Sequence, residues 1–321
     1  MIRLVLRRAA TSIGLFVVMA VLTFIAIEAL PGDACTSLLG RAATANKLNQ
    51  CREANGLYQP VLERLMSWLG GILQGDLGYS IKRARPVSEL IGARVRNSLV
   101  LAAVSGALAF PAAVLMGLAV GIATAHGKTS RWARVVDSIG LVLMTLPEFV
   151  TASALWLMFS IWIPILPAVS VLSSSSSLAD VVAGIWLPAV TLAVVVFAHV
   201  MRSMRASVVA TSSRPFVDAA RLRGVAESAV LRRHLLPAAL PPTINVISVT
   251  AAWLLTGTFV VEVVFNFPGL GRLAVDAISD RDTDLILALT LLGLAVFVVS
   301  SFVSDTATRV LDPRTRSATE S

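Results

Sequence analysis

Long apolar runs constrain this chain more than any other feature of its sequence. They lie at 12–30, 98–125, 135–164, 185–200, 238–261 and 285–303. About 20 apolar residues in a helix cross the ~30 Å hydrocarbon core of a bilayer, and the shortest run can cross with help from its flanks. Because the chain is 56% hydrophobic and only 14% charged, a soluble globular protein is excluded. The sequence therefore predicts an all-α integral membrane protein with six transmembrane helices.

The basic residues indicate how these helices are oriented. A net charge of +8 would suit a nucleic-acid partner, but the arginines punctuate the apolar runs and form no single patch, so none is expected. Sixteen of the 27 Lys and Arg residues fall on one side, in the two termini and two inter-helix segments. The two short loops opposite hold only Arg272 and Arg281, and long segments are largely exempt from the positive-inside rule. We therefore expect both termini in the cytoplasm and residues 31–96 outside, as an external subdomain.

The segment 202–237 is basic and amphipathic, and it separates the fourth and fifth apolar runs. Pro215 predicts a helix start, because proline pre-sets φ for the first turn, and Asp218 suits the positive end of the helix dipole. Gly224 predicts the end of this helix, in the left-handed conformation that glycine adopts cheaply. A second helix is expected at about 227–234, running up to Pro237. The pattern favours a stiff cytoplasmic knob; the alternative is an ordinary hairpin whose arginines only obey topology.

The same segment resembles the coupling loop of ABC importer permeases. The pattern of that family is Glu-Ala-Ala, three residues, Gly, nine residues, then Ile-x-Leu-Pro. Both spacings are kept here by Asp218-Ala219-Ala220, Gly224 and Leu236-Pro237, while Asp218 replaces Glu and His234 replaces Ile. The resemblance implies that Asp218, Ala219, Ala220, Gly224, Leu236 and Pro237 form a knob that sits in a groove of a separate ATPase subunit.

Further motifs extend the resemblance, over nearly the whole chain, to the dipeptide, oligopeptide and nickel branch of this family. They are YQP at 58–60, WL at 68–69, GDLG at 75–78, RPV at 85–87, TGTFVVEVVFNFPGLGRL at 256–273 and LDPR at 311–314. A type I importer permease fold follows by analogy. It comprises a first helix and external subdomain at 1–97, a five-helix core at 98–310, and a cytoplasmic tail at 311–321.

The family resemblance also implies an assembly in the bacterial inner membrane. The expected partners are a paralogous permease in a heterodimer, ABC ATPase subunits that bind ATP and Mg, an external substrate-binding protein, and membrane lipid. This chain itself is expected to hold no cofactor and no catalytic residues. Family members carry dipeptides, oligopeptides, glutathione, nickel chelates and other small solutes, and the sequence does not choose among them.

Other classes of protein fit the sequence less well. A secondary transporter driven by an ion gradient is the main alternative, but the apolar runs hold almost no relay carboxylates and show no clear inverted repeat. An intramembrane enzyme lacks a visible nucleophile and base pair. The segment 121–129 fails as a P-loop, because five residues separate Gly121 from Gly127 where four are needed. Three unclustered histidines make a metal site improbable.

Two carboxylates are candidates for the transport path. Glu148 follows Pro147 and lies 13 residues after Val135, about 20 Å along a straight helix and so near the bilayer middle. It either lines the path and attracts a cationic group such as a peptide amino terminus, or has a purely structural role, protonated or paired with the partner permease. Peptide permeases usually have a small or neutral residue there. Glu262 either gates the external mouth or satisfies backbone donors, beside a tight turn expected at Pro268-Gly269 and Gly271.

The expected external segments carry two further candidates. Cys35 and Cys51 either form a disulfide, which persists outside the cell, or remain two free thiols. The Asp residues at 280, 282 and 284 are spaced as in a calcium loop, but no glycine or distal Glu completes that motif. They either cap the last helix or meet a binding protein.

Overall fold

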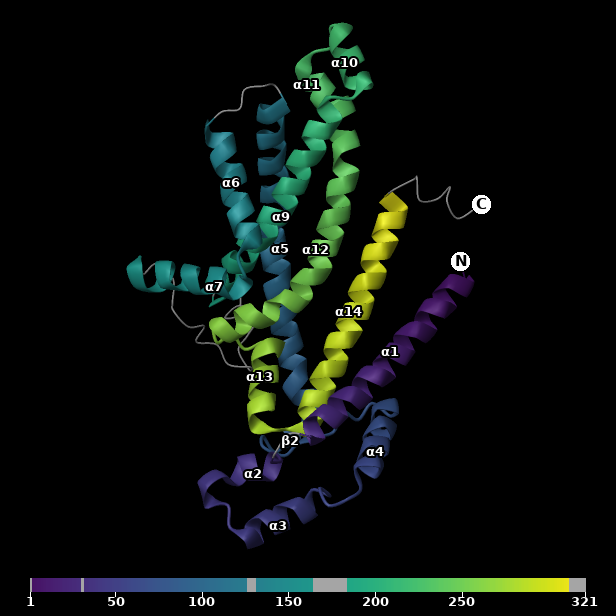
Figure 1. Cartoon of the computed structure of the whole chain (residues 1–321), viewed down its shortest axis with the longest axis vertical. Helices are drawn as coiled ribbons and strands as arrows, with labels where there is room; N and C mark the ends of the chain where they lie inside the picture. Colours follow the sequence, from purple (N-terminus) through teal and green to yellow (C-terminus); the bar gives the residue numbers. More distant parts are fainter. Residues whose placement is uncertain (1, 30–31, 126–130, 164–183, 312–321) are drawn as a thin grey trace. The chain divides into compact units, whose positions relative to one another are not determined.

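The computed structural model describes residues 2–29, 32–125, 131–163 and 184–311 (Figure 1). The loop at 126–130 and the predicted tail from 312 onward lie outside these ranges. The chain forms two compact units. The first unit is mainly Met1–Ser98 with Pro268–Val298, and the second is mainly Leu99–Leu172, Ser177–Phe267 and Val299–Ser321. We describe each unit by itself.

The first unit brings the N-terminal segment and residues 268–298 together around a small apolar core. Its elements are α1 (Ile2–Glu28), α2 (Ala34–Leu39), η1 (Gly40–Ala42), α3 (Ala45–Ala54), α4 (Val61–Leu73), β1 (Tyr79–Ser80), β2 (Arg85–Pro86), the start of α5 (Val87–Ala125), α13 (Leu270–Asp280) and most of α14 (Thr283–Leu311). The core is built from Ala20 and Phe24 of α1, Leu65 and Trp68 of α4, and Leu287 and Leu291 of α14. The two strands pair antiparallel, with Tyr79 opposite Pro86.

A group of acidic residues fixes the start of α14 to the strand pair. Ser80 donates a hydrogen bond to the buried carboxylate of Asp282, and the Tyr79 N–H donates to Asp284 over 3.2 Å. Gly78 has φ +90°, and a Cβ there would come within 2.6 Å of Asp284, so only glycine fits. Asp282 directly precedes α14 and accepts the backbone N–H of Leu285 in its first turn, so the capping interpretation is supported for Asp282. No group of acidic, His or Cys side chains in the described ranges could hold a metal ion.

A disulfide joins α2 to α3 in this unit. Cys35 and Cys51 are bonded, with their Cα atoms 5.9 Å apart and 16 positions apart in the sequence. Asp33 caps the start of α2 by accepting the Thr36 N–H, and it also pairs with Arg52 of α3 at 2.6 Å. The bond and the ion pair together hold two short helices that have little apolar surface to bury.

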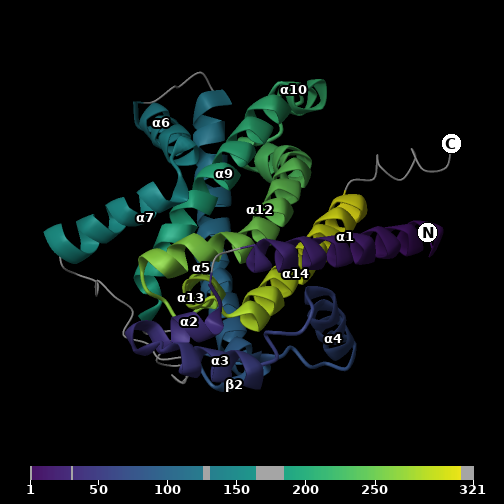
Figure 2. The same cartoon turned by 60° about the horizontal axis from the view of Figure 1, so that its bottom comes forward.

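The second unit is a set of packed helices. After most of α5 come α6 (Arg131–Thr145), α7 (Glu148–Trp156), η2 (Leu157–Trp162), α9 (Trp186–Ser212), α10 (Pro215–Leu222), α11 (Glu227–Val230), η3 (Leu231–Leu235) and α12 (Leu236–Val264). Helices α9 and α12 run side by side with α10 and α11 at their end, and α7 turns away from α6 (Figures 1 and 2). A Cβ on Gly117 of α5 would lie 2.5 Å from the Met201 carbonyl oxygen, so glycine lets α5 and α9 touch backbone to backbone.

Several of these helices are apolar and long enough to cross a membrane. Within the described residues they are Val87–Ala125, Trp186–Ser212 and the continuous stretch Glu227–Val264, together with the α6–α7 pair, which is bent by 113°. Shorter apolar segments occupy Val17–Glu28 and Thr283–Val299. The expectation of a helical membrane protein with several apolar spans is confirmed, except that β1 and β2 make the chain mostly helical and not all-α; the count of six spans stays a prediction.

The third apolar run differs from its expected form. Residues 135–164 do not make one straight helix, because the chain bends by 113° between α6 and α7. Pro147 causes this break, since it has no N–H and disfavours helical geometry in the residue before it. The estimate that placed Glu148 about 20 Å along a straight helix was therefore wrong. Glu148 is instead the first residue of α7.

Two other predicted boundaries, the end of one helix and the start of one turn, differ from those in the structure. Helix α9 continues 12 residues beyond the predicted end at Val200, to Ser212, because Arg202 and Arg205 of its extension pair with Asp137 of α6 at 3.6 and 3.5 Å. The tight turn expected at 268–271 begins earlier, where Asn266 has φ +50°. Gly271 is not in that turn but buried within α13.

Candidate coupling knob and helix-lined cavity

The segment 214–235 folds as the sequence predicts at its start and at its corner. Helix α10 begins at Pro215 after an extended Arg214. Gly224 has φ +76°; its N–H reaches the Arg221 carbonyl at 2.9 Å, and the Val225 N–H reaches the Ala220 carbonyl at 3.2 Å. This pair of bonds is a Schellman motif, which satisfies the last carbonyls of α10. The predicted left-handed glycine is confirmed.

The knob, defined here as residues 214–235, has its own internal support. Val217, Ala220 and Val230 are buried against one another between α10 and α11. Arg221 donates to Glu227 over 2.9 Å, and Asp218 lies 3.7 Å away on the other side. The hydrogen bond to Glu227 is the main reason that the pKa of Arg221 is raised. A small core and an ion pair therefore hold the two short helices in a fixed arrangement.

The second helix of the knob does not stop at Pro237. It continues through the π-helical segment Leu231–Leu235 into α12, so that Glu227–Val264 is one helix. Pro237 has no N–H to donate to the carbonyl one turn earlier, and the wider π turn accommodates this missing hydrogen bond. Leu235 and Ala239 pack against Met204 and Val208 of α9. The knob is therefore joined to α12 without a break and packed against α9.

The knob exposes three large apolar side chains among its charged ones. Leu222 is 89% exposed, and Phe216 and Val225 are also exposed. Among the residues proposed from the sequence, Asp218, Ala219 and Pro237 are exposed, Leu236 is partly buried, and Ala220 belongs to the internal core. Leu222 was missed, although a leucine between Arg221 and Arg223 in a short polar helix was a visible signal.

A cavity of about 290 Å³ lies among α6, α7, α9 and α12. It is lined by Met144, Leu146, Pro147, Glu148, Val195, His199, Thr250 and Trp253. The Oε2 atom of Glu148 is buried and has no hydrogen-bond partner within the described part of the chain. A buried carboxylate oxygen without a donor is costly, so this cavity is suited to a ligand that brings donors.

Two neighbours of Glu148 also offer acceptors. His199 Nδ1 lies 3.1 Å from the Val195 carbonyl; since a carbonyl only accepts, Nδ1 is the donor, and in the tautomer that carries its proton there Nε2 is an acceptor. Thr250 donates its hydroxyl proton to the Val246 carbonyl over 2.6 Å, which leaves its oxygen able to accept. Neither residue was predicted, because both lie on helices distant in sequence from Glu148.

Glu262 lies elsewhere in the second unit. Its side chain is completely buried in α12, and its backbone carbonyl accepts the Phe267 N–H at 2.8 Å. The neighbouring Val261, Phe265 and Phe267 belong to the apolar core. A role for Glu262 as a gate stays a prediction.

Apolar helices long enough to cross a bilayer, two of them joined by a compact exposed knob, define a polytopic membrane protein. The sequence matches two families over most of its length. Residues 117–317 match the family "Binding-protein-dependent transport system inner membrane component", and residues 1–102 match its N-terminal family, "Binding-prot-dependent transport system membrane comp, N-term". The chain belongs to this family.

Relatives match the chain end to end. It is 34% identical to the glutathione transport system permease protein GsiC of Salmonella typhimurium over 320 residues, covering 98% of this chain and 99% of the relative. It is 30% identical to the oligopeptide transport system permease protein AppB of Bacillus subtilis, covering 97% and 98%. A putative peptide permease protein of Brucella suis is also 30% identical, covering 98% and 99%.

Family membership fixes the general role of the chain. It is a non-catalytic, multi-pass permease subunit of the inner membrane, in a transport system that depends on a binding protein. Such a system implies a substrate-binding protein and an ATPase as partners. The predicted family and the predicted class of function are confirmed.

Proposed function

We propose that this chain forms half of the translocation path of an ATP-driven importer for peptides or glutathione. The substrate class follows from the names of its relatives, which are peptide and glutathione permeases. A paralogous permease would form the other half. ATPase subunits would bind ATP and Mg on the cytoplasmic side, where both termini lie, and a binding protein would deliver substrate outside.

The exposed Leu222 is the observation that best supports coupling through the knob. A leucine that is 89% exposed at the tip of a braced pair of helices serves no purpose in this chain's own core. Between Arg221 and Arg223 it suits a groove with an apolar floor and an acidic rim. Such a groove on an ATPase subunit would grip the knob and move α9 and α12 with it.

Co-purification of the ATPase subunits with a tagged permease tests this docking. Leu222→Asp should abolish co-purification, because it places an unpaired charge in an apolar groove. The permease itself should fold normally, because Leu222 is exposed to solvent in this chain. Leu62→Asp is the matched control, since Leu62 of α4 is 67% exposed and belongs to the first unit. Equal ATPase recovery with Leu222→Asp and wild type would refute docking through this face.

The cavity around Glu148 supports a second part of the proposal. Glu148, His199 and Thr250 each offer an acceptor to the same space. A primary ammonium has three N–H donors, and the ring of Trp253 in the lining also favours a cation. We infer that the cavity belongs to the path and receives the protonated amino group of the substrate. Glu262 would act nearer the external mouth.

A further inference from the structure

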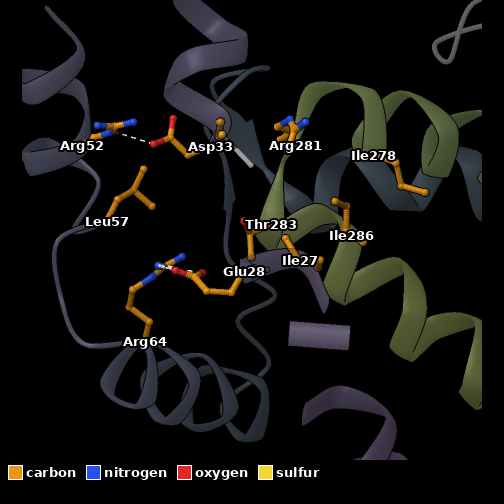
Figure 3. A pocket seen from close by; sticks show the side chains of 12 residues that line it. Ile27, Glu28, Asp33, Arg52, Leu57, Arg64, Ile278, Arg281, Thr283 and Ile286 are labelled. Atoms are coloured by element: carbon orange, nitrogen blue, oxygen red, sulfur yellow. Dashed lines mark hydrogen bonds and ion pairs between the residues drawn. The ribbon is translucent and has the colours of Figure 1, made fainter. Parts of the chain in front are cut away.

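A second cavity lies wholly within the first unit and is unrelated to the knob or to Glu148. Its volume is about 270 Å³. Figure 3 shows that its walls come from the end of α1, the α2–α3 region, α4, the end of α13 and the start of α14. Three arginines from three of these elements line it, namely Arg52, Arg64 and Arg281.

The charges that line this cavity do not balance. Arg52 pairs with Asp33 at 2.6 Å, and Arg64 pairs with Glu28 at 3.1 Å (Figure 3). Arg281 forms no ion pair with any described residue, and its Nη1 atom is buried without a hydrogen-bond partner in the same ranges. The site therefore has one more cation than anion. The buried Nη1 group of Arg281 is a charged donor that would be satisfied by an anionic acceptor.

The backbone conformation of Arg281 also indicates that its side chain has a function. Arg281 caps the end of α13 in the left-handed conformation, with φ +53° and ψ 39°. Glycine adopts this conformation at no steric cost, whereas other residues are strained. An arginine held in a strained position, with its guanidinium group beside a cavity, indicates that its side chain has a use that outweighs the strain.

The position of the cavity along the helices identifies the kind of anion. The apolar segment Val17–Glu28 of α1 ends at the cavity, and Thr283–Val299 of α14 begins there. These are the points at which a membrane helix leaves the hydrocarbon and meets lipid headgroups. The lining also includes the apolar side chains Ile27, Ile278 and Ile286. We propose that this cavity binds the phosphate group of an anionic phospholipid, with Arg281 as the principal donor.

Lipid binding to the purified transporter complex tests this proposal. Delipidated complex is titrated with phosphatidylglycerol, phosphatidylcholine or inorganic phosphate, and bound ligand is measured by native mass spectrometry. Wild type should retain phosphatidylglycerol in preference to phosphatidylcholine. Arg281→Gly should weaken that binding about tenfold, the usual size for a lost charge-assisted hydrogen bond. It should not unfold the protein, because glycine accepts the positive φ.

Arg272→Gln is the matched control, since Arg272 lies on the same helix but is paired with Asp276 at 3.1 Å. It should bind phosphatidylglycerol like wild type. If inorganic phosphate binds in an Arg281-dependent manner and displaces the lipid, the site is still an oxyanion site and its natural ligand is soluble phosphate. Equal binding of phosphatidylglycerol by wild type and Arg281→Gly, or no binding by either, would overturn the proposal.

Discussion

Glu148 combines two local features that suit a charged group. It is the first residue of α7, where the positive end of the helix dipole favours a carboxylate, and its Oε2 atom faces no donor within the described residues. The dipole favours the charged form of the carboxyl group, and we propose that a ligand supplies the missing donor. A purely structural carboxylate would be expected to use both oxygens.

Glu148→Gln tests this role, because it keeps the shape of the side chain and removes its charge. In proteoliposomes that contain the complete transporter, uptake of peptides with a free amino terminus should fall about tenfold or more. Uptake of the same peptides after N-acetylation should change little. Equal effects on both substrates, at normal expression and assembly, would exclude the proposed contact.

The buried carboxyl group of Asp282 should make the stability of the first unit depend on pH. Burial raises the pKa of its carboxyl group, although the hydrogen bond from Ser80 opposes this shift. The folded protein therefore binds this proton more tightly than the unfolded chain, whose Asp has a pKa of about 3.9. Its stabilising contribution is complete below that pH and is lost as the pH rises through the raised pKa.

Thermal unfolding between about pH 4 and pH 8 measures this effect. Asp282→Asn should flatten the fall in stability with rising pH, because the amide cannot titrate and still accepts the hydrogen bond from Ser80. Ser279→Ala, at an exposed position of α13, serves as a control that should leave the slope unchanged. A wild-type slope in Asp282→Asn would show that another group causes the dependence.

At the scale of elements, Gly224 sets the angle between α10 and α11. A Cβ there would meet nothing within 4 Å, so the cost of a side chain is the backbone strain alone, about 1–2 kcal/mol for the left-handed conformation. Gly224→Val should leave the permease inserted but uncoupled, with ATPase stimulation and uptake both lost. Gly224→Asn should be milder, since Asn tolerates this conformation. Normal stimulation in the valine variant would refute the coupling role.

The disulfide between α2 and α3 stabilises two helices with little core of their own. A bridge across a loop of this length contributes about 3 kcal/mol in the chain-entropy model. Cys35→Ser with Cys51→Ser should therefore lower the stability of the first unit without changing the knob. Alkylation and mass spectrometry of non-reduced wild type should find neither thiol, and two alkylated cysteines would contradict the bridge.

Local rules predicted some elements well and others only in part. Pro215 and Gly224 fix the start and end of α10 by their own backbone chemistry, and the structure agrees at both. Pro147 indicated a kink, but the 113° bend depends on packing that no local rule contains. His199 and Thr250 join Glu148 only because α9 and α12 pack beside α7, so no sequence pattern reveals them.

At the scale of the whole molecule, the source of energy separates the two transport mechanisms. Uptake by the assembled system should stop when ATP is depleted and should persist when an ionophore collapses the ion gradients. This follows because the chain belongs to a binding-protein-dependent family, in which a partner hydrolyses ATP. The reverse result would favour a transporter driven by an ion gradient.

The π-helical segment Leu231–Leu235 has a geometric consequence for the knob. A π turn contains one residue more than an α turn, and one residue corresponds to about 100° of rotation around a helix axis. The wider turn absorbs this extra residue, so α12 and the knob keep nearly the rotational phase of a regular helix that is one residue shorter. Deleting one residue within the segment should therefore leave Leu222 facing nearly the same way, whereas deleting one residue from the regular part of α12 should swing Leu222 by about 100°.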